Sequence, residues 1–229
     1  MPNELNPSCT ELVELQSGVI SRKQAILGGM EPDVIDGLLR SRRWQWLQRG
    51  SYAVFTGQPP REATLWAALL RAGPGAALSH QTAAELFRLT DRPSSLIHLT
   101  IPAGRRVDGI AGAVIHRSAR VEEARHPALL PPRTRIEETV LDLTQNAACA
   151  EDAFSWVCSA CQRGLTTTAR LGSAMSTRRK LRWRAELSGL LSDVGEGAHS
   201  VLEYRYVRRV ERPHGLPRAR RQRRLIRGT

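Results

Sequence analysis

Lysine is nearly missing from this chain, and so are long apolar runs and a cysteine framework. Lys23 and Lys180 are the only lysines among 34 basic residues, so almost all positive charge is arginine. Four cysteines in 229 residues are too few and too scattered for a disulfide scaffold. No apolar stretch approaches the roughly 20 residues of a membrane span, and the polar N-terminus does not resemble a secretory signal. We therefore expect a cytoplasmic protein with no membrane partner.

Motifs of common catalytic sites are missing as well. The chain has no glycine-rich phosphate loop, no nucleophile elbow and no histidine-rich metal signature. Cys158 and Cys161 have zinc-ligand spacing, but no second pair follows, so we interpret them as two thiols packed on one helix face. His80, in the first turn of a predicted helix that Ser79 can cap, has no nucleophile or carboxylate nearby, which favours a structural role. We predict no catalytic residue, no metal site and no cofactor.

The adjacent acids Glu137 and Glu138 resemble an acid/base couple only superficially. Thr134 and Glu137 have the spacing of a capping box, which gives Glu137 a role at a helix start. Neighbouring helical side chains also point about 100° apart. The sequence thus favours a structural role for both carboxylates.

The net charge of +12 is unevenly distributed along the chain. Residues 1–80 hold 8 basic and 7 acidic groups, residues 81–200 hold 16 and 13, and residues 201–229 hold 10 and 2. A basic isoelectric point is typical of proteins that bind nucleic acids, but here it describes mainly the last thirty residues. Arginine in place of lysine, together with abundant alanine, also indicates a GC-rich coding bias.

The first 57 residues have the order of parts of a winged helix-turn-helix. Leu5, Cys9, Leu12 and Val13 have helical spacing, Ser21 and Gln24 form a capping box for a second helix, and Pro32 starts a third. Residues 44–48 and 52–55 flank a turn at Gly50, which predicts the two strands of a wing. This arrangement is typical of contact with double-stranded DNA.

Basic residues at the rear of the third helix and in the wing are better placed for phosphates than for base edges, so modest sequence specificity is expected. The predicted DNA-binding residues are Arg22, Lys23, Arg40, Arg42, Arg43 and Arg49. Acidic residues on the front of the third helix, Glu31, Asp33 and Asp36, oppose this prediction. Two alternatives therefore stay open, a small packing unit without a nucleic-acid partner and a protein-interaction domain. Trp44, Trp46 and Tyr52 are expected to pack the wing onto the helices.

The rest of the chain predicts an α+β fold, with a mixed helical domain over residues 58–195 that contains a small β-sheet. Helical patterns cover residues 62–72, 150–162, 168–176 and 180–193. Residues 96–101 and 110–116 are β-rich and are expected to pair as a hairpin, with Arg105, Arg106 and Arg117 around it.

Four phrases of the first half resemble a known bacterial family, the AbiEi-like antitoxins of type IV toxin-antitoxin systems. They are Val19–Ala25, Arg49–Ala53, Gly73–Ala84 and Ile97–Pro102. The resemblance implies a winged helix that binds the promoter of its own operon, followed by an antitoxin region. It also implies an indirect functional partner, a nucleotidyltransferase-like toxin that the antitoxin opposes without necessarily touching it.

The third segment, residues 196–229, is predicted as a basic helix and tail. Ser200–Val210 is similar to the opening helix of a very-short-patch-repair-type endonuclease domain, in which Glu203 matches the helix carboxylate. The further carboxylates that would hold a metal ion do not follow, so we expect a truncated nuclease-like segment without cleavage activity. The alternative function is a catalytically incomplete remnant of a winged-helix-targeted PD-(D/E)XK endonuclease-like protein.

Overall fold

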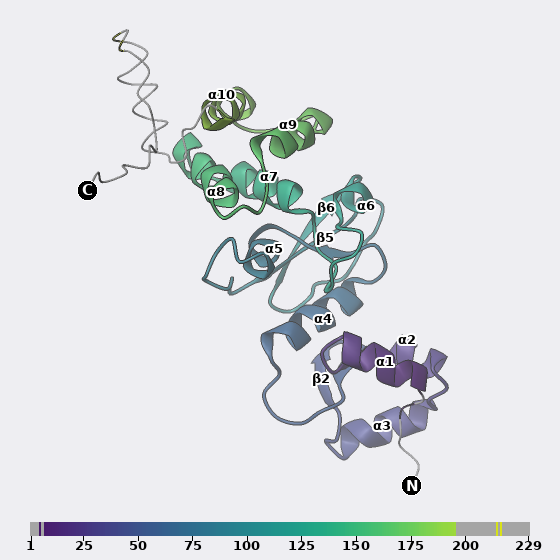
Figure 1. The fold of residues 1–229 in the computed structure, drawn as a ribbon. Helices are drawn as coiled ribbons and strands as arrows, with labels where there is room; N and C mark the ends of the chain where they lie inside the picture. The colour runs from purple at the N-terminus through teal and green to yellow at the C-terminus, as the bar shows by residue number, and fades with distance from the viewer. Residues whose placement is uncertain (1–4, 6, 196–213, 215, 217–229) are drawn as a thin grey trace, which may run out of the picture. The chain divides into compact units, whose positions relative to one another are not determined.

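The computed structural model describes residues 5, 7–195, 214 and 216, and its fold is α+β, as predicted (Figure 1). The described residues form two compact units, one from the N-terminal part up to residue 83 together with residues 92–135, and the other from residues 84–91 together with residues 136–195. Apart from residues 214 and 216, the predicted nuclease-like segment, including Glu203, lies outside the described residues. Among the described helices, none has the length and apolar content needed to cross a bilayer.

The first unit begins with a winged helix-turn-helix, as the sequence predicts. Its elements are α1 (Pro7–Leu15), β1 (Val19–Ser21), α2 (Arg22–Leu27), α3 (Pro32–Arg40), β2 (Gln45–Gln48) and β3 (Ser51–Ala53). The strands form an antiparallel sheet in the order β1-β3-β2, and Gly50 turns the chain between β2 and β3 with a φ of 78°. This turn is the tip of the wing.

Local contacts explain why these residues form these helices. The predicted capping box is present: Gln24 N donates to Ser21 Oγ over 3.2 Å, and Ser21 N donates to Gln24 Oε1 over 2.9 Å. Gly28 ends α2, and a Cβ at Gly28 would lie 2.0 Å from Cys9 Sγ, so only glycine allows α1 this close. Ile20, Ile35 and Tyr52 fill the core between helices and sheet.

The first unit continues past residue 57, where the sequence suggested a domain boundary. Seven of the twelve residues of helix α4 (Arg61–Ala72) are buried, and the helix contacts all three strands of the winged-helix sheet as well as β4 and β5. It is followed by β4 (Ala77–Leu78), α5 (His80–Leu86), β5 (Ile97–Pro102), β6 (Ala113–Ser118) and α6 (Val121–Ala124). Because α4 packs on both sheets, they belong to one compact unit.

The expected hairpin of β5 and β6 is wrong in strand direction. The two strands pair in parallel, with Ile97 opposite Ala113 and Pro102 opposite Ser118. The ten residues 103–112 therefore carry the chain back along the sheet, and Ile110, expected in a strand, is a buried residue of this connection. An apolar strand pattern does not encode direction, since both pairings bury the same alternate residues.

The described part of the second unit contains the end of α5 and four further helices, α7 (Ile136–Asn146), α8 (Ala150–Gln162), α9 (Thr168–Thr177) and α10 (Arg184–Gly195). Their apolar faces share one core, in which Leu141, Val157 and Leu187 are almost fully buried. Cys158 is buried in this core and Cys161 packs against it half-buried, which confirms that the two thiols are packing residues.

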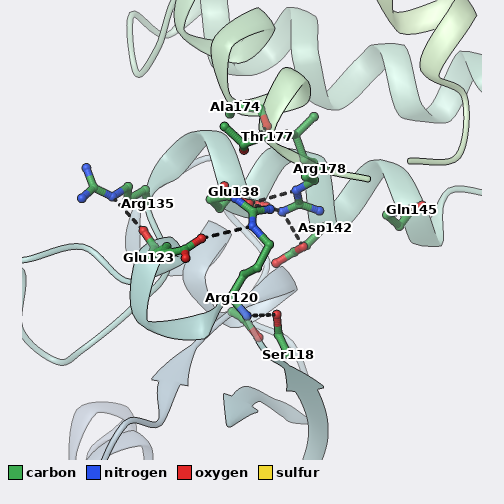
Figure 2. Close-up of polar contacts among 12 residues, drawn as sticks. Ser118, Arg120, Glu123, Arg135, Glu138, Asp142, Gln145, Ala174, Thr177 and Arg178 are labelled. Atoms are coloured by element: carbon green, nitrogen blue, oxygen red, sulfur yellow. Dashed lines mark hydrogen bonds and ion pairs between the residues drawn. The ribbon is translucent and has the colours of Figure 1, made fainter. Parts of the chain in front are cut away.

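Glu137 and Glu138 are buried and paired with arginines of α9 and its C-terminal end. Glu137 Oε1 accepts from Thr166 Oγ1 over 2.7 Å and lies 2.9 Å from Arg170 Nε. Glu138 contacts Arg178, which also reaches Asp142 Oδ1 over 2.8 Å, one turn further along α7 (Figure 2). Burial by itself lowers the pKa of Arg178, but Asp142 and Glu138 outweigh it and raise that pKa. Both carboxylates thus join α7 to the segment around α9.

Candidate nucleic-acid interface

A groove in the first unit is bordered by six basic side chains. It has a volume of about 710 Å³ and runs between α2, the wing turn, α4 and the loop that follows α4. Its cations are Arg22, Lys23, Arg49, Arg71, Arg105 and Arg125. Among the described residues that line it, none is Asp or Glu. The groove is therefore a concentration of positive charge at the edge of the winged helix.

Lys23 and Arg49 are the most accessible of these cations. Both side chains are exposed, Lys23 on α2 and Arg49 at the tip of the wing. Within the described residues, neither has an ion-pair partner. Their charge is thus available to an anion from solvent.

Arg105 forms part of the groove wall in a fixed position. Its Nη1 donates to the Pro74 carbonyl over 3.1 Å, and its Nε is buried without a hydrogen-bond partner among the described residues. The guanidinium lies against Gly73, where a Cβ would be 2.2 Å from Nη2. Gly73 also has φ 83° and ψ −169°, a conformation that side chains strongly disfavour. The glycine turn after α4 therefore shapes the groove.

Three of the groove arginines have acidic neighbours outside the lining. Arg71 lies 3.6 Å from Asp108, and Arg125 lies 3.0 Å from Glu122. Both carboxylates are well exposed, so water and salt screen these pairs, which leaves the cations available for exchange with phosphate. Arg22 is held more firmly.

Arg22 makes a two-pronged ion pair with Asp36, which joins α2 to α3. The Arg22 Nη1 and Nη2 atoms lie 2.6 and 3.2 Å from the two Asp36 carboxylate oxygens. The hydrogen bond from Arg22 holds the pKa of Asp36 below its ordinary value. Of the predicted DNA-binding residues, Arg22 is thus the one already neutralised within the fold.

The other predicted cations, Arg40, Arg42 and Arg43, do not line the groove. They are exposed at the C-terminal end of α3, where Arg42 has a left-handed φ of 56°. Arg40 Nε donates to the Asp36 carbonyl over 3.4 Å, and Arg43 Nε donates to Ser41 Oγ over 3.4 Å. The structure thus divides the six predicted residues into a groove set and a helix-end set.

Two of the three wing aromatics pack as expected, and the third does not. Trp44 and Tyr52 are buried in the winged-helix core. Trp46 is 60% exposed and touches the fold through an edge contact with Tyr52, with ring centroids 4.9 Å apart. The prediction of core packing is therefore wrong for Trp46, whose ring lies beside its buried cross-strand partner Tyr52 but stays largely exposed.

Arg71 and Arg125 contribute to the groove although no sequence pattern singled them out. Arg71 lies in the last turn of α4, and Arg125 directly follows α6. Only tertiary packing brings these positions beside α2 and the wing. Arg105 was placed beside the β-rich runs by the sequence, without being assigned to the interface.

Comparison with known proteins places the fold and no more. No protein-family model and no curated protein sequence matches the chain. Among solved structures, the RV2827C protein from Mycobacterium tuberculosis is similar, with a TM-score of 0.54 and 19% sequence identity. The similarity covers 85% of this chain and 76% of that one. The structural match supports a shared α+β fold, and at this low sequence identity it supports nothing further. The resemblance to AbiEi-like antitoxins therefore stays a prediction.

Proposed function

We propose that this protein is a DNA-binding transcriptional regulator that holds double-stranded DNA mainly by its phosphates. The observation that carries this proposal is the groove beside α2 and the wing, whose lining, as far as the chain is described, has six basic residues and no acidic one. Duplex DNA carries one negative charge per about 1.7 Å of its axis, so closely spaced cations meet several phosphates at once. Lys23 and Arg49 make the leading contacts because both are exposed.

The acidic front of α3 argues for weak reading of base edges. Glu31 and Asp33 are exposed at the start of this helix, where a reading helix enters the major groove. Carboxylates in that position repel the phosphates on either side of the groove. The regulator therefore gains its affinity mainly from phosphate contacts, and its preference for an operator comes from DNA shape more than from base contacts.

In keeping with the antitoxin-like motifs, we further propose that the protein represses its own operon and opposes a nucleotidyltransferase-like toxin indirectly. A reporter fused to the upstream region of the gene measures this. Expression of the wild-type protein should lower the reporter signal, and Lys23→Glu with Arg49→Glu should restore it. Equal reporter signals with and without the wild-type protein would contradict the assignment to its own operon. DNA binding itself is tested by a separate measurement.

DNA binding is tested by fluorescence anisotropy with a labelled duplex from the upstream region. The double variant Lys23→Glu/Arg49→Glu should bind at least about tenfold more weakly, because each substitution removes a phosphate contact and adds a repelling charge. The matched control is Arg179→Glu/Lys180→Glu, which makes the same charge change at exposed positions of the second unit. Equal losses in both variants, or no loss in either, would contradict the assignment of the interface to the groove.

A further inference from the structure

Three histidines from separate segments of the chain meet in the first unit. They are His80 at the start of α5, His98 on β5 and His116 on β6, and each offers a ring nitrogen within 4.8 Å of the others. His98 Nδ1 lies 3.2 Å from His116 Nε2. The rings of His80 and His116 stack with centroids 3.7 Å apart. No linear motif joins these residues, which lie 18 positions apart in the sequence.

The fold explains how they come together. In the parallel pairing of β5 and β6, His98 lies opposite Val114 and His116 lies opposite Thr100, so both histidines are on the same face of the sheet. His80 follows β4 with a left-handed φ of 49°, a conformation that costs free energy in a residue other than glycine. Such strain persists where the surrounding structure imposes it, and it is common at ligand sites.

The surroundings suit neutral imidazoles that are held in one orientation. Burial lowers the pKa of His98, because a desolvated ring disfavours the charged form. Ser79 Oγ lies 3.0 Å from His80 Nδ1 and accepts from Thr100 Oγ1 over 2.8 Å, and both hydroxyls are buried. A hydrogen bond between one ring nitrogen and an oxygen fixes the orientation of the ring. The other ring nitrogen then stays available to a ligand, as in metal sites with an outer shell of hydrogen-bond partners.

We propose that His80, His98 and His116 bind one divalent transition-metal ion of the zinc type, with one ring nitrogen each and water in the fourth position. Zinc–nitrogen bonds of about 2.05 Å in a tetrahedron place the nitrogens about 3.3 Å apart. The 3.2 Å between His98 and His116 already matches this distance. The other pairs lie within 4.8 Å, so a closure of at most about 1.5 Å is needed, with the rings of His80 and His116 rotating out of their stack to direct their in-plane lone pairs at one ion.

The donor set selects the class of ion. A cluster of imidazoles alone favours zinc, cobalt, nickel or copper, whereas magnesium and calcium require oxygen ligands. Binding exchanges the contact between His98 and His116 for two metal–nitrogen bonds, and it requires neutral rings. Affinity should therefore fall as pH is lowered through the histidine range. This site is separate from the basic groove, since none of the three histidines lines it.

The test uses the full chain after removal of metal by a chelator. Titration with Zn²⁺ by calorimetry, and with Co²⁺ by visible absorption, should give one ion per chain and the absorption bands of tetrahedral cobalt. His98→Ala or His116→Ala should weaken binding more than about 100-fold, because loss of an outer-shell partner alone costs about 10- to 100-fold. Ser79→Ala should fall in that smaller range, and His214→Ala, at an exposed turn, should bind like the wild type.

A measurement on the wild-type chain removes any dependence on how the variants fold. The ring ¹⁵N resonances of the histidines report directly which nitrogens take the ion. The proposal expects Zn²⁺ to shift the rings of His80, His98 and His116 and no others. Sub-stoichiometric binding, unchanged resonances of these three rings, or wild-type affinity in both His98→Ala and His116→Ala would overturn it.

Discussion

The two units of this protein use basic side chains in opposite ways. In the second unit, the Arg178 side chain is 11% exposed and lies between the carboxylates of Glu138 and Asp142. In the first unit, Lys23 and Arg49 are exposed beside a groove whose described lining has no carboxylate. One set of cations stabilises the fold, and the other is available to a partner.

This difference shows why net charge is a poor guide to function in an arginine-rich chain. A guanidinium that is buried between carboxylates adds to the isoelectric point and nothing to the attraction for DNA. What matters is where cations gather without acidic neighbours. The predictions below test whether the two sets really have separate roles.

The largest effect is expected from Arg178→Ala in the second unit. This substitution leaves the buried carboxylates of Glu138 and Asp142 without their cation, which should lower the free energy of unfolding by about 3–5 kcal/mol. Urea denaturation followed by circular dichroism measures the loss. The affinity for DNA of the folded variant should equal that of the wild type.

The control for this prediction is the neighbouring substitution Arg179→Ala at an exposed position. It should change stability by no more than about 0.5 kcal/mol. If both alanine variants unfold at the same urea concentration, the buried network is not a major source of stability, and the contrast between the two units is lost.

A smaller effect is expected from Gly73→Ala at the edge of the groove. The backbone at Gly73 has φ 83° and ψ −169°, so alanine should cost about 1–3 kcal/mol of stability. The new Cβ also displaces the guanidinium of Arg105, which should weaken DNA binding. Denaturation and anisotropy on the same preparation measure both effects.

Gly37→Ala is the matched control, since it makes the same change in the interior of α3 with nothing within 4 Å of the added Cβ. There alanine should stabilise the helix by about 0.5–1 kcal/mol. A Gly73→Ala variant that is as stable as Gly37→Ala would show that the glycine turn is not constrained as described.

The smallest effect is expected from Asp33→Lys on α3. If this helix approaches the DNA, removal of the exposed acid and addition of a cation should strengthen binding several-fold at low salt. Asp152→Lys, an exposed acid in the first turn of α8, is the control and should leave affinity unchanged. Equal gains from both would mean that only the overall charge matters.

Local signals in the sequence predicted the winged helix well because its parts are determined by near neighbours. The capping box of Ser21 and Gln24 and the proline at position 32 set helix starts, and Gly50 sets the turn of the wing. The pairing of β6 with β5 was predicted, but its parallel direction was not, since tertiary packing determines the direction of a strand pair.

The candidate sites show the same limit. The sequence predicted six basic residues of a DNA-binding motif. Only the fold shows that Arg22, Lys23 and Arg49 line the groove, whereas Arg40, Arg42 and Arg43 lie outside it. The three histidines were missed because they come from a helix and two strands whose parallel pairing was not foreseen. Residues that meet only through long-range contacts leave no spacing signature in one sequence.

The salt dependence of DNA binding tests the central claim most directly. A plot of log affinity against log salt concentration has a slope of about −0.9 per phosphate contacted. For the upstream duplex, the slope of Lys23→Glu/Arg49→Glu should be less negative than that of the wild type by about 2, while Arg179→Glu/Lys180→Glu keeps the wild-type slope. An identical slope for all three proteins would contradict the account, because the exposed cations of the groove would then contact no phosphate.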